Sequence, residues 1–186
     1  MNNYMKLIGI RAREVSKHKI STKTKNKILH YYAELLNKKK KFIISQNLED
    51  IKFANKIRLN ENLINRLQLS EKKIDEIRNS VIKITKLKDP VDVTLDNWKR
   101  PNGLKISRVT IPIGVIGVIY ESRPNVTSDV ASLCFKSGNV VILKGGSEAI
   151  NTNRALSKLF RESLKKNKVD KNFVQFIDSK ERKLVD

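Results

Sequence analysis

Two short loops, 120–125 and 144–148, hold the residues whose types and spacing are best suited to chemistry. The second loop reads Lys144-Gly145-Gly146-Ser147-Glu148. A lysine beside two glycines can meet a phosphate or a ribose hydroxyl without steric obstruction. A glutamate near the start of a helix can accept hydrogen bonds from a ribose diol, although the positive end of the helix favours a carboxylate there in any case. This loop therefore predicts a phosphate or ribose site.

The first loop carries Glu121, Arg123 and Asn125. The planar guanidinium of Arg123 suits a carboxylate or a phosphate, and Pro124 stiffens the backbone beside it. An ion pair from Arg123 to Glu121 or Asp129 is the alternative interpretation. The position of the loop and its density of polar groups favour a ligand role. Neither loop holds an evident nucleophile.

The elements that position both loops form an alternation of strands and helices. We predict strands at 115–120, 140–143 and 173–177, helices at 126–136 and 148–166, and a further helix that begins at Ser179. The first strand is short, β-branched and continuously apolar, which is typical of a strand covered on both faces. Crossovers of this length require parallel, right-handed pairing. Open α/β sheets bind ligands at the carboxyl ends of such strands, and both loops occupy that position.

The first half of the chain predicts a layer of helices. Residues 1–88 show helical spacing of their apolar residues, with Ser21 and Ser70 as helix caps. Shorter amphipathic helices are expected at 48–57 and 62–67. None of these helices carries an obvious chemical group, so we interpret them as a layer packed on the sheet.

A β-hairpin is predicted between the helices and the sheet. Residues 91–111 alternate apolar and polar residues around the turn signal Pro101-Asn102-Gly103. Trp98 lies near the tip of this hairpin. It is either an interface anchor or a cover for apolar surface, and we favour the cover.

The composition is strongly basic, with 39 Lys and Arg against 19 Asp and Glu and a formal net charge of +20. Lysine is spread along the N-terminal half together with abundant Asn and Ile, which indicates a compositional bias of the source genome more than a selected binding face. No zinc finger, helix-turn-helix or aromatic platform accompanies the charge. We therefore predict no nucleic-acid partner, although a patch this basic can carry phosphate contacts.

The single cysteine, Cys134, lies within a predicted helix, where a buried and inert thiol is expected. One cysteine allows no disulfide framework and fits a reducing cytoplasm. His18 and His30 have no ligand spacing, so we predict no metal site. No apolar segment reaches the length of a membrane span or the pattern of a signal peptide. These features predict a cytoplasmic protein with no membrane partner.

Three motifs, GVIGVIYE-x-RPNVT, K-x-GN and ILKGGSEA, follow one another within residues 112–153. This stretch closely resembles gamma-glutamyl phosphate reductase, also called glutamate-5-semialdehyde dehydrogenase, of proline biosynthesis. Looser matches extend the resemblance over the chain: DP-V before the hairpin, NGL-x-I-x-R-V in its return strand, and VQFID in the third strand of the sheet.

The resemblance implies an α/β fold like that of the aldehyde dehydrogenases. It implies N-terminal helices, an oligomerisation-type hairpin and an incomplete parallel, Rossmann-like sheet. On this basis residues 1–90 form an N-terminal helical layer, 91–111 the hairpin, and 112–186 part of an NADP-binding domain, while the catalytic domain is absent.

The resemblance also implies NADPH-dependent reduction of L-glutamyl 5-phosphate to glutamate 5-semialdehyde. In that reaction a thiolate attacks the acyl phosphate, and the thioester accepts hydride from the nicotinamide. The implied cofactor contacts come from Lys144, Gly145, Gly146, Ser147 and Glu148, and the implied substrate contacts from Glu121, Arg123 and Asn125. Two departures stand out: the Gly-Gly spacing differs by one residue from that of the wider superfamily, and the loop 121–125 replaces its usual Trp-Asn-Phe-Pro.

The catalytic cysteine of the family lies beyond Asp186, and Cys134 is not its counterpart, so no catalytic residue is predicted. We expect the N-terminal part of a reductase that is inactive alone, whether as a truncated product, a split subunit or a partial chain. Its expected partner is a second copy or a C-terminal half. The second hypothesis is a non-catalytic protein that binds another chain through its basic helices and hairpin, and the third is a basic nucleic-acid-binding protein.

Overall fold

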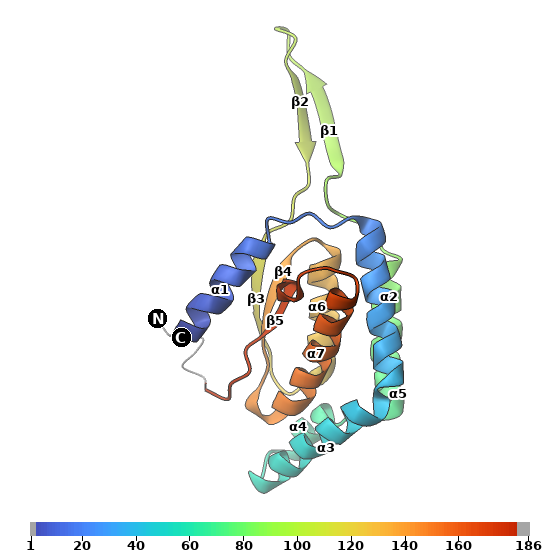
Figure 1. Ribbon diagram of the computed structural model, residues 1–186, viewed down its shortest axis with the longest axis vertical. Helices are drawn as coiled ribbons and strands as arrows, with labels where there is room; N and C mark the ends of the chain where they lie inside the picture. Colours follow the sequence, from blue (N-terminus) through green and yellow to red (C-terminus); the bar gives the residue numbers. More distant parts are fainter. Residues whose placement is uncertain (1–2, 182–186) are drawn as a thin grey trace.

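The computed structural model describes residues 3–181, in which helices surround a small parallel sheet and a hairpin projects away from them (Figure 1). The helices are α1 (Asn3–Val15), α2 (Thr22–Lys38), α3 (Lys40–Lys56), α4 (Glu61–Leu67), α5 (Glu71–Thr85), α6 (Pro124–Lys136) and α7 (Ile150–Lys166). The strands are β1 (Thr94–Lys99), β2 (Lys105–Val109), β3 (Val115–Ile119), β4 (Val140–Lys144) and β5 (Val174–Phe176). Two 3-10 turns, η1 (Ser147–Ala149) and η2 (Lys171–Phe173), precede α7 and β5.

The parallel sheet has the order β3-β4-β5, which confirms the predicted alternation of strands and helices. Val115 pairs with Val140 and Ile119 pairs with Lys144, so β3 and β4 end at the same level. Helix α6 makes the crossover between them, and Pro124 opens this helix at a position where its missing N–H costs no hydrogen bond. The register therefore brings the loops that follow β3 and β4 to the same edge of the sheet.

The prediction that both faces of β3 are covered is wrong. Ile116 and Val118 pack against the core, but the alternate residues are exposed, and Ile119 keeps 68% of its surface. Helix α1 lies on the face of the sheet opposite α6 (Figure 1). There it contacts β4 and η2 and, within residues 3–181, does not cover β3. Because Ile111 and Ile113 are exposed as well, an apolar strip leads into this edge strand. We call residues 111–119 the β3 edge.

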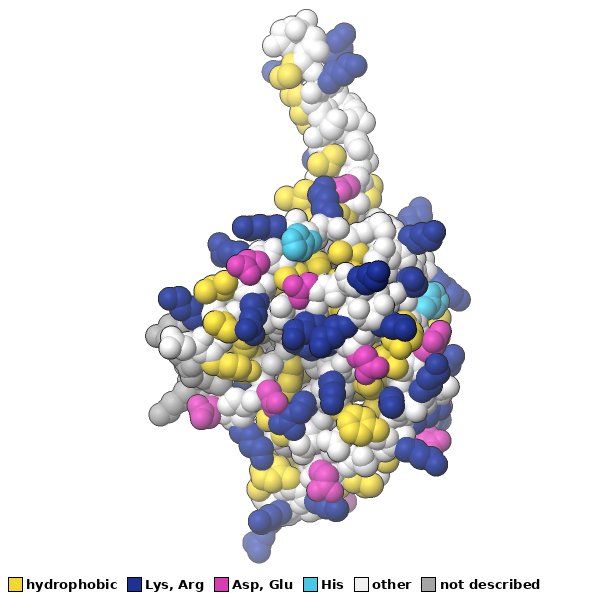
Figure 2. Space-filling view, viewed as in Figure 1, with side chains coloured by type: hydrophobic (Ala, Val, Ile, Leu, Met, Phe, Trp, Pro, Cys, Tyr) yellow, Lys and Arg dark blue, Asp and Glu magenta, His cyan; other side chains and the backbone are white. Residues whose placement is uncertain are grey.

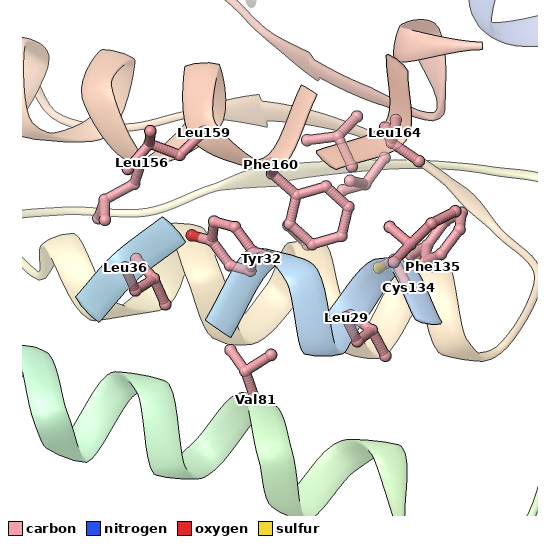
Figure 3. Close-up of a cluster of buried hydrophobic side chains, with 14 of the residues drawn as sticks. Leu29, Tyr32, Leu36, Val81, Cys134, Phe135, Leu156, Leu159, Phe160 and Leu164 are labelled. Atoms are coloured by element: carbon pink, nitrogen blue, oxygen red, sulfur yellow. The ribbon is translucent and has the colours of Figure 1, made fainter. Parts of the chain in front are cut away.

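The hydrophobic core lies between the sheet and the helices α2, α5, α6 and α7 (Figure 3). Aromatic rings meet at its centre: Tyr32 and Phe160 are tilted against each other with ring centroids 4.7 Å apart, and Phe135 meets Phe160 edge-on at 5.8 Å. The Tyr32 hydroxyl and Ser128 Oγ share a hydrogen bond of 2.6 Å. This bond satisfies the one polar group that the tyrosine buries. The N-terminal helices are thus a layer of the same core as the sheet.

The hairpin of β1 and β2 stands clear of this core (Figure 1). Trp98 pairs with Ile106 across the hairpin and remains 43% exposed. Every residue of β1 is exposed. Trp98 lies opposite the half-buried Ile106, and its interpretation as a cover for apolar surface stays a prediction.

The boundaries of the N-terminal helices differ from the predicted ones in one respect. Helix α3 begins at Lys40 rather than near residue 48, and only Lys39 separates it from α2. The ion pair of Lys40 with Asp75, at 2.7 Å, fixes this break against α5. The helix predicted from Ser179 is not formed up to residue 181, and the rest of it lies outside the described residues. No helix of residues 3–181 is long and apolar enough to cross a membrane.

A buried ion pair ties the start of α2 to the segment that leads into the hairpin. Lys25 Nζ donates to Asp89 Oδ2 at 2.9 Å, and these side chains are only 2% and 12% exposed. Burial raises the pKa of Asp89, but hydrogen bonds from Lys25, Thr22 and the Val91 N–H outweigh it. The net pKa of Asp89 therefore lies below its usual value of 3.8. The ammonium of Lys136 adds a further positive charge near this carboxylate.

We predict that Asp89→Asn lowers the free energy of unfolding at neutral pH by about 3 kcal/mol, because it leaves Lys25 buried without a counter-charge. A carboxyl with a lowered pKa in the folded state stabilises above its unfolded pKa and loses that contribution as the pH falls through its folded pKa. Urea unfolding across acid pH should therefore show a shallower loss of stability in this variant than in the wild type.

The control is Asp92→Asn, which removes the exposed ion pair of Asp92 with Lys19. This change should cost less than about 1 kcal/mol. Equal losses in the two variants would contradict a special role for the buried pair.

Candidate cofactor site

Two hydrogen bonds join the two loops that the sequence singles out, the first of them from the Tyr120 N–H to the carbonyl of Lys144 at 3.1 Å. Because Ile119 and Lys144 are paired, the chain leaves β3 and β4 side by side. Ser122 Oγ then donates to Glu148 Oε1 at 2.6 Å. Ser122 is buried, whereas Glu148 is half-buried. Within residues 3–181, the second carboxylate oxygen of Glu148 accepts only one long hydrogen bond, of 3.5 Å from Ser147 Oγ. Glu148 therefore faces the first loop with acceptor capacity to spare.

Lys144 is the last residue of β4, and it is only 7% exposed. Its ammonium donates to the carbonyl of Gly145 at 3.2 Å and to that of Ser179 at 2.9 Å. An ammonium has three N–H donors, so one remains. Lys144 thus links the loop after β4 to the segment after β5, which draws the carboxyl ends of all three strands together.

The two glycines of this loop allow close approach by the protein's own side chains. A Cβ on Gly145 would lie 2.1 Å from Nδ2 of Asn153, and a Cβ on Gly146 would lie 2.0 Å from Oε1 of Glu148. Real Cβ atoms do not approach other atoms so closely, so glycine is required at both positions unless a neighbour moves. The carboxylate of Glu148 therefore lies directly over the backbone of Gly146.

A buried chain of hydrogen bonds lies behind the loops. The Tyr120 hydroxyl and Thr127 Oγ1 are 2.6 Å apart, and Thr127 Oγ1 lies 2.8 Å from Asn153 Oδ1. Burial raises the pKa of Tyr120 to about 12, so this side chain is a neutral hydroxyl at ordinary pH. Nδ2 of Asn153 is buried beside Gly145 and has no hydrogen-bond partner among residues 3–181. These residues hold β3, α6 and α7 at a fixed distance from the loop.

The N-terminus of α7 is capped by a residue from another helix. Ala149 offers no side-chain cap, but Asp50 of α3 accepts hydrogen bonds from the N–H groups of Asn151 and Thr152 and from both of their side chains, at 2.6–3.0 Å. Burial raises the pKa of Asp50, and these hydrogen bonds oppose that rise. Asp50 therefore sets the position of α7, and with it that of the loop 144–148.

The residues predicted to contact substrate have different surroundings. Glu121 and Arg123 are exposed. Within residues 3–181, no ion pair joins Arg123 to Glu121 or Asp129, so the alternative interpretation of Arg123 as an ion-pair residue is wrong. Arg123 and Glu121 border a small hollow beside Ser122. Asn125 donates to Asp129 Oδ2 at 3.1 Å along α6. The first two side chains are thus open to a ligand, and Asn125 is partly engaged.

Sequence reasoning did not single out Ser122, Asn153 or Asp50. Ser122 lies inside the loop 120–125, so its position among the predicted ligand residues could have marked it as a site residue. Nothing in the sequence around Asp50 or Asn153 marks them, because their partners lie far away along the chain.

Neither a nucleophile nor a metal centre accompanies the site in the part of the chain that the structure describes. Cys134 is buried in α6, and burial raises the pKa of its thiol, which disfavours the reactive thiolate. No group of three or more His, Cys, Asp or Glu among residues 3–181 is arranged to hold a metal ion.

Relatives of the chain share both its sequence and its fold. The gamma-glutamyl phosphate reductase of Petrotoga mobilis is 43% identical over 162 residues, which are 87% of this chain and 39% of that protein. The solved gamma-glutamyl phosphate reductase of Thermotoga maritima is 40% identical and superposes with a TM-score of 0.94 over 97% of this chain and 44% of that one.

The wider fold is that of the aldehyde dehydrogenases. An acetylating aldehyde dehydrogenase from Geobacillus thermoglucosidasius, 14% identical, superposes with a TM-score of 0.71 over 97% of this chain and 38% of its own. No family model matches the sequence. The chain spans about two fifths of the length of the curated relatives it matches.

We predict that Gly145→Ala lowers the free energy of unfolding by about 1–3 kcal/mol, because the new methyl group would collide with the buried amide of Asn153. Thermal unfolding measures this loss. The matched control is Gly117→Ala in β3, where nothing lies within 4 Å of the added Cβ. An unchanged melting temperature in Gly145→Ala would contradict the close packing of this loop.

Proposed function

Because the chain is a homologue of the gamma-glutamyl phosphate reductases, we propose that it forms the cofactor side of an NADPH-dependent reductase of L-glutamyl 5-phosphate. The observation that carries this proposal is the hydrogen bond from Ser122 to Glu148, which unites two ligand-type loops at the carboxyl edge of a parallel sheet. The reaction converts an acyl phosphate, NADPH and a proton to glutamate 5-semialdehyde, NADP⁺ and phosphate.

The chemistry of the donor and acceptor groups fits a dinucleotide. Glu148 retains a half-exposed carboxylate oxygen, which suits the hydroxyls of a ribose. Lys144 retains one ammonium donor, and the half-buried Ser147 adds a hydroxyl to the same loop. Gly145 and Gly146 keep the backbone free of side chains at this point. When bound, NADPH would supply the hydride of the reaction.

Arg123 and Glu121 form the substrate side of the proposal. Both are exposed next to Ser122, and through Ser122 they adjoin the carboxylate of Glu148. The guanidinium of Arg123 suits the carboxylate or the phosphate of glutamyl 5-phosphate. Asn125, which Asp129 already engages, stabilises the first turn of α6 and has a smaller share in this role.

The acyl-transfer step needs a thiolate that residues 3–181 do not supply, since Cys134 is buried in the core. We therefore place the nucleophile on polypeptide that corresponds to the remaining length of the relatives. The β3 edge supports this arrangement, because its exposed apolar residues and free strand edge suit pairing with a further strand. The exposed hairpin, with Trp98 and Leu95, offers a second surface for a further copy.

A second candidate function rests on the same two surfaces. A protein that binds another chain through the β3 edge and the hairpin, without taking part in chemistry, needs only these exposed apolar residues. Formation of a complex without reductase activity distinguishes this candidate from the first.

For cofactor binding, we predict that Glu148→Gln weakens the affinity of the chain for NADPH about tenfold, because it replaces a charged acceptor of ribose hydroxyls by a neutral one. Fluorescence titration with NADPH measures the affinity. Glu34→Gln, on the exposed face of α2, is the control for the loss of one negative charge. Equal affinities in the wild type and Glu148→Gln would contradict the assignment of this loop.

For catalysis, we predict that the 186-residue chain alone does not oxidise NADPH in the presence of L-glutamyl 5-phosphate. Co-expression with the segment of the Thermotoga maritima reductase that the chain does not cover should give a complex with activity, which size-exclusion chromatography and NADPH absorbance detect. Cys134→Ser should leave that activity unchanged, since the thiol is buried. Activity of the chain alone would overturn the proposed division of the site.

A further inference from the structure

A basic groove lies between α1, α7 and the outer edge of β5, and has a volume of about 580 Å³. Its basic lining residues are Arg11, Arg154, Lys158, Arg161, Lys165 and Lys171. Figure 2 shows Lys and Arg side chains over the region of α7 and β5 in the middle of the molecule. None of the residues assigned to the two loops lines this groove.

The positive charges of the groove are poorly balanced. Only Glu162 and Asp178 among its lining residues are acidic, and Asp178 is engaged by Arg154 at 2.6 Å. The other basic side chains, Arg161 apart, make no hydrogen bond or ion pair with residues 3–181. Like charges gathered in one concavity raise its free energy unless an anion joins them. The groove therefore has an excess of cationic donors and no internal counter-charge for most of them.

Arg161 is anchored to the backbone of β5. It is half-buried, and one of its terminal nitrogens donates to the carbonyl of Val174 at 2.9 Å, which orients the guanidinium. Burial lowers the pKa of Arg161; the charge of Asp170 opposes this, and the like charge of Arg11 adds to it. Two guanidiniums, that of Arg11 from α1 and that of Arg161 from α7, thus line the same groove.

Ser157 provides an independent sign of a ligand. It lines the groove one turn of α7 before Arg161, and it is only 3% exposed. Its Oγ is buried and has no hydrogen-bond partner in the described part of the chain. A buried hydroxyl without a partner costs free energy, and nearly all such groups in folded proteins find a donor or an acceptor. A ligand atom in the groove would supply the missing partner.

We propose that this groove binds a small molecule that carries phosphate groups. Guanidiniums recognise phosphate oxygens through paired N–H donors, and the surrounding lysines add charge without fixed geometry. The volume lies within the usual range for small-molecule sites. Ile8 and Phe176 also line the groove and offer an apolar surface to the rest of the ligand. The site is separate from the one at the carboxyl ends of β3 and β4.

Isothermal titration with inorganic pyrophosphate at about 0.15 M salt, where exposed charges are largely screened, tests this proposal. The 186-residue chain should bind one equivalent saturably. Arg11→Gln should weaken binding about tenfold, because it removes one charge-assisted donor. Lys72→Gln, a matched loss of one exposed positive charge on α5, should leave the affinity unchanged.

Ser157→Ala separates a binding role from a structural one. The hydroxyl has no hydrogen-bond partner within residues 3–181, so its removal should leave the melting temperature unchanged or raise it. The affinity for pyrophosphate should nevertheless fall about 3-fold to 10-fold, which corresponds to one hydrogen bond.

Three results would overturn the proposal. The first is the absence of saturable binding. The second is an equal loss of affinity in Lys72→Gln and Arg11→Gln, which would mean that pyrophosphate responds only to the net charge of +20. The third is displacement of pyrophosphate by NADPH, which would assign the groove to the cofactor site.

Discussion

The arrangement of this protein depends on one carboxylate, that of Asp50. Helix α7 starts without a capping side chain of its own, and its first N–H groups are buried. A buried helix end requires acceptors, and Asp50 provides them from α3 through four hydrogen bonds. Because the loop 144–148 leads directly into α7, the hydrogen bonds from α7 to Asp50 couple the position of this loop to the packing of α3. Helix α7 in turn contributes Leu156, Phe160 and Leu164 to the core (Figure 3).

From this anchored helix, short-range contacts order the rest of the site. Glycine at positions 145 and 146 permits Asn153 and Glu148 to lie against the backbone, and Asn153 connects onward to Thr127 and Tyr120. Lys144 draws in the segment after β5. The result is a set of loops held mainly by buried hydrogen bonds, so the groups left open to a ligand, Glu148 and Arg123, extend from a rigid base.

Charge has several roles in this strongly basic chain. Lys25, Lys136 and Lys144 are buried and have partners: the first meets Asp89, the second Asn26 and the carbonyl of Thr85, and the third two backbone carbonyls. These lysines stabilise junctions between elements. The cations of the groove beside β5 instead face one open space. A net charge therefore says little about binding until each ammonium and guanidinium is placed.

The sequence alone determined the order of the elements, the parallel pairing of β3 with β4, the two loops and the family to which they point, because strand and helix periods and contiguous motifs are local properties. It also placed Cys134 in a buried helix. The bare face of β3, the exposure of Trp98, the cap from Asp50 and the groove between α1 and α7 were decided only by tertiary structure. Each of these depends on residues far apart along the chain, whose encounter is set by packing and by the need of buried polar groups for partners, and no local pattern records it.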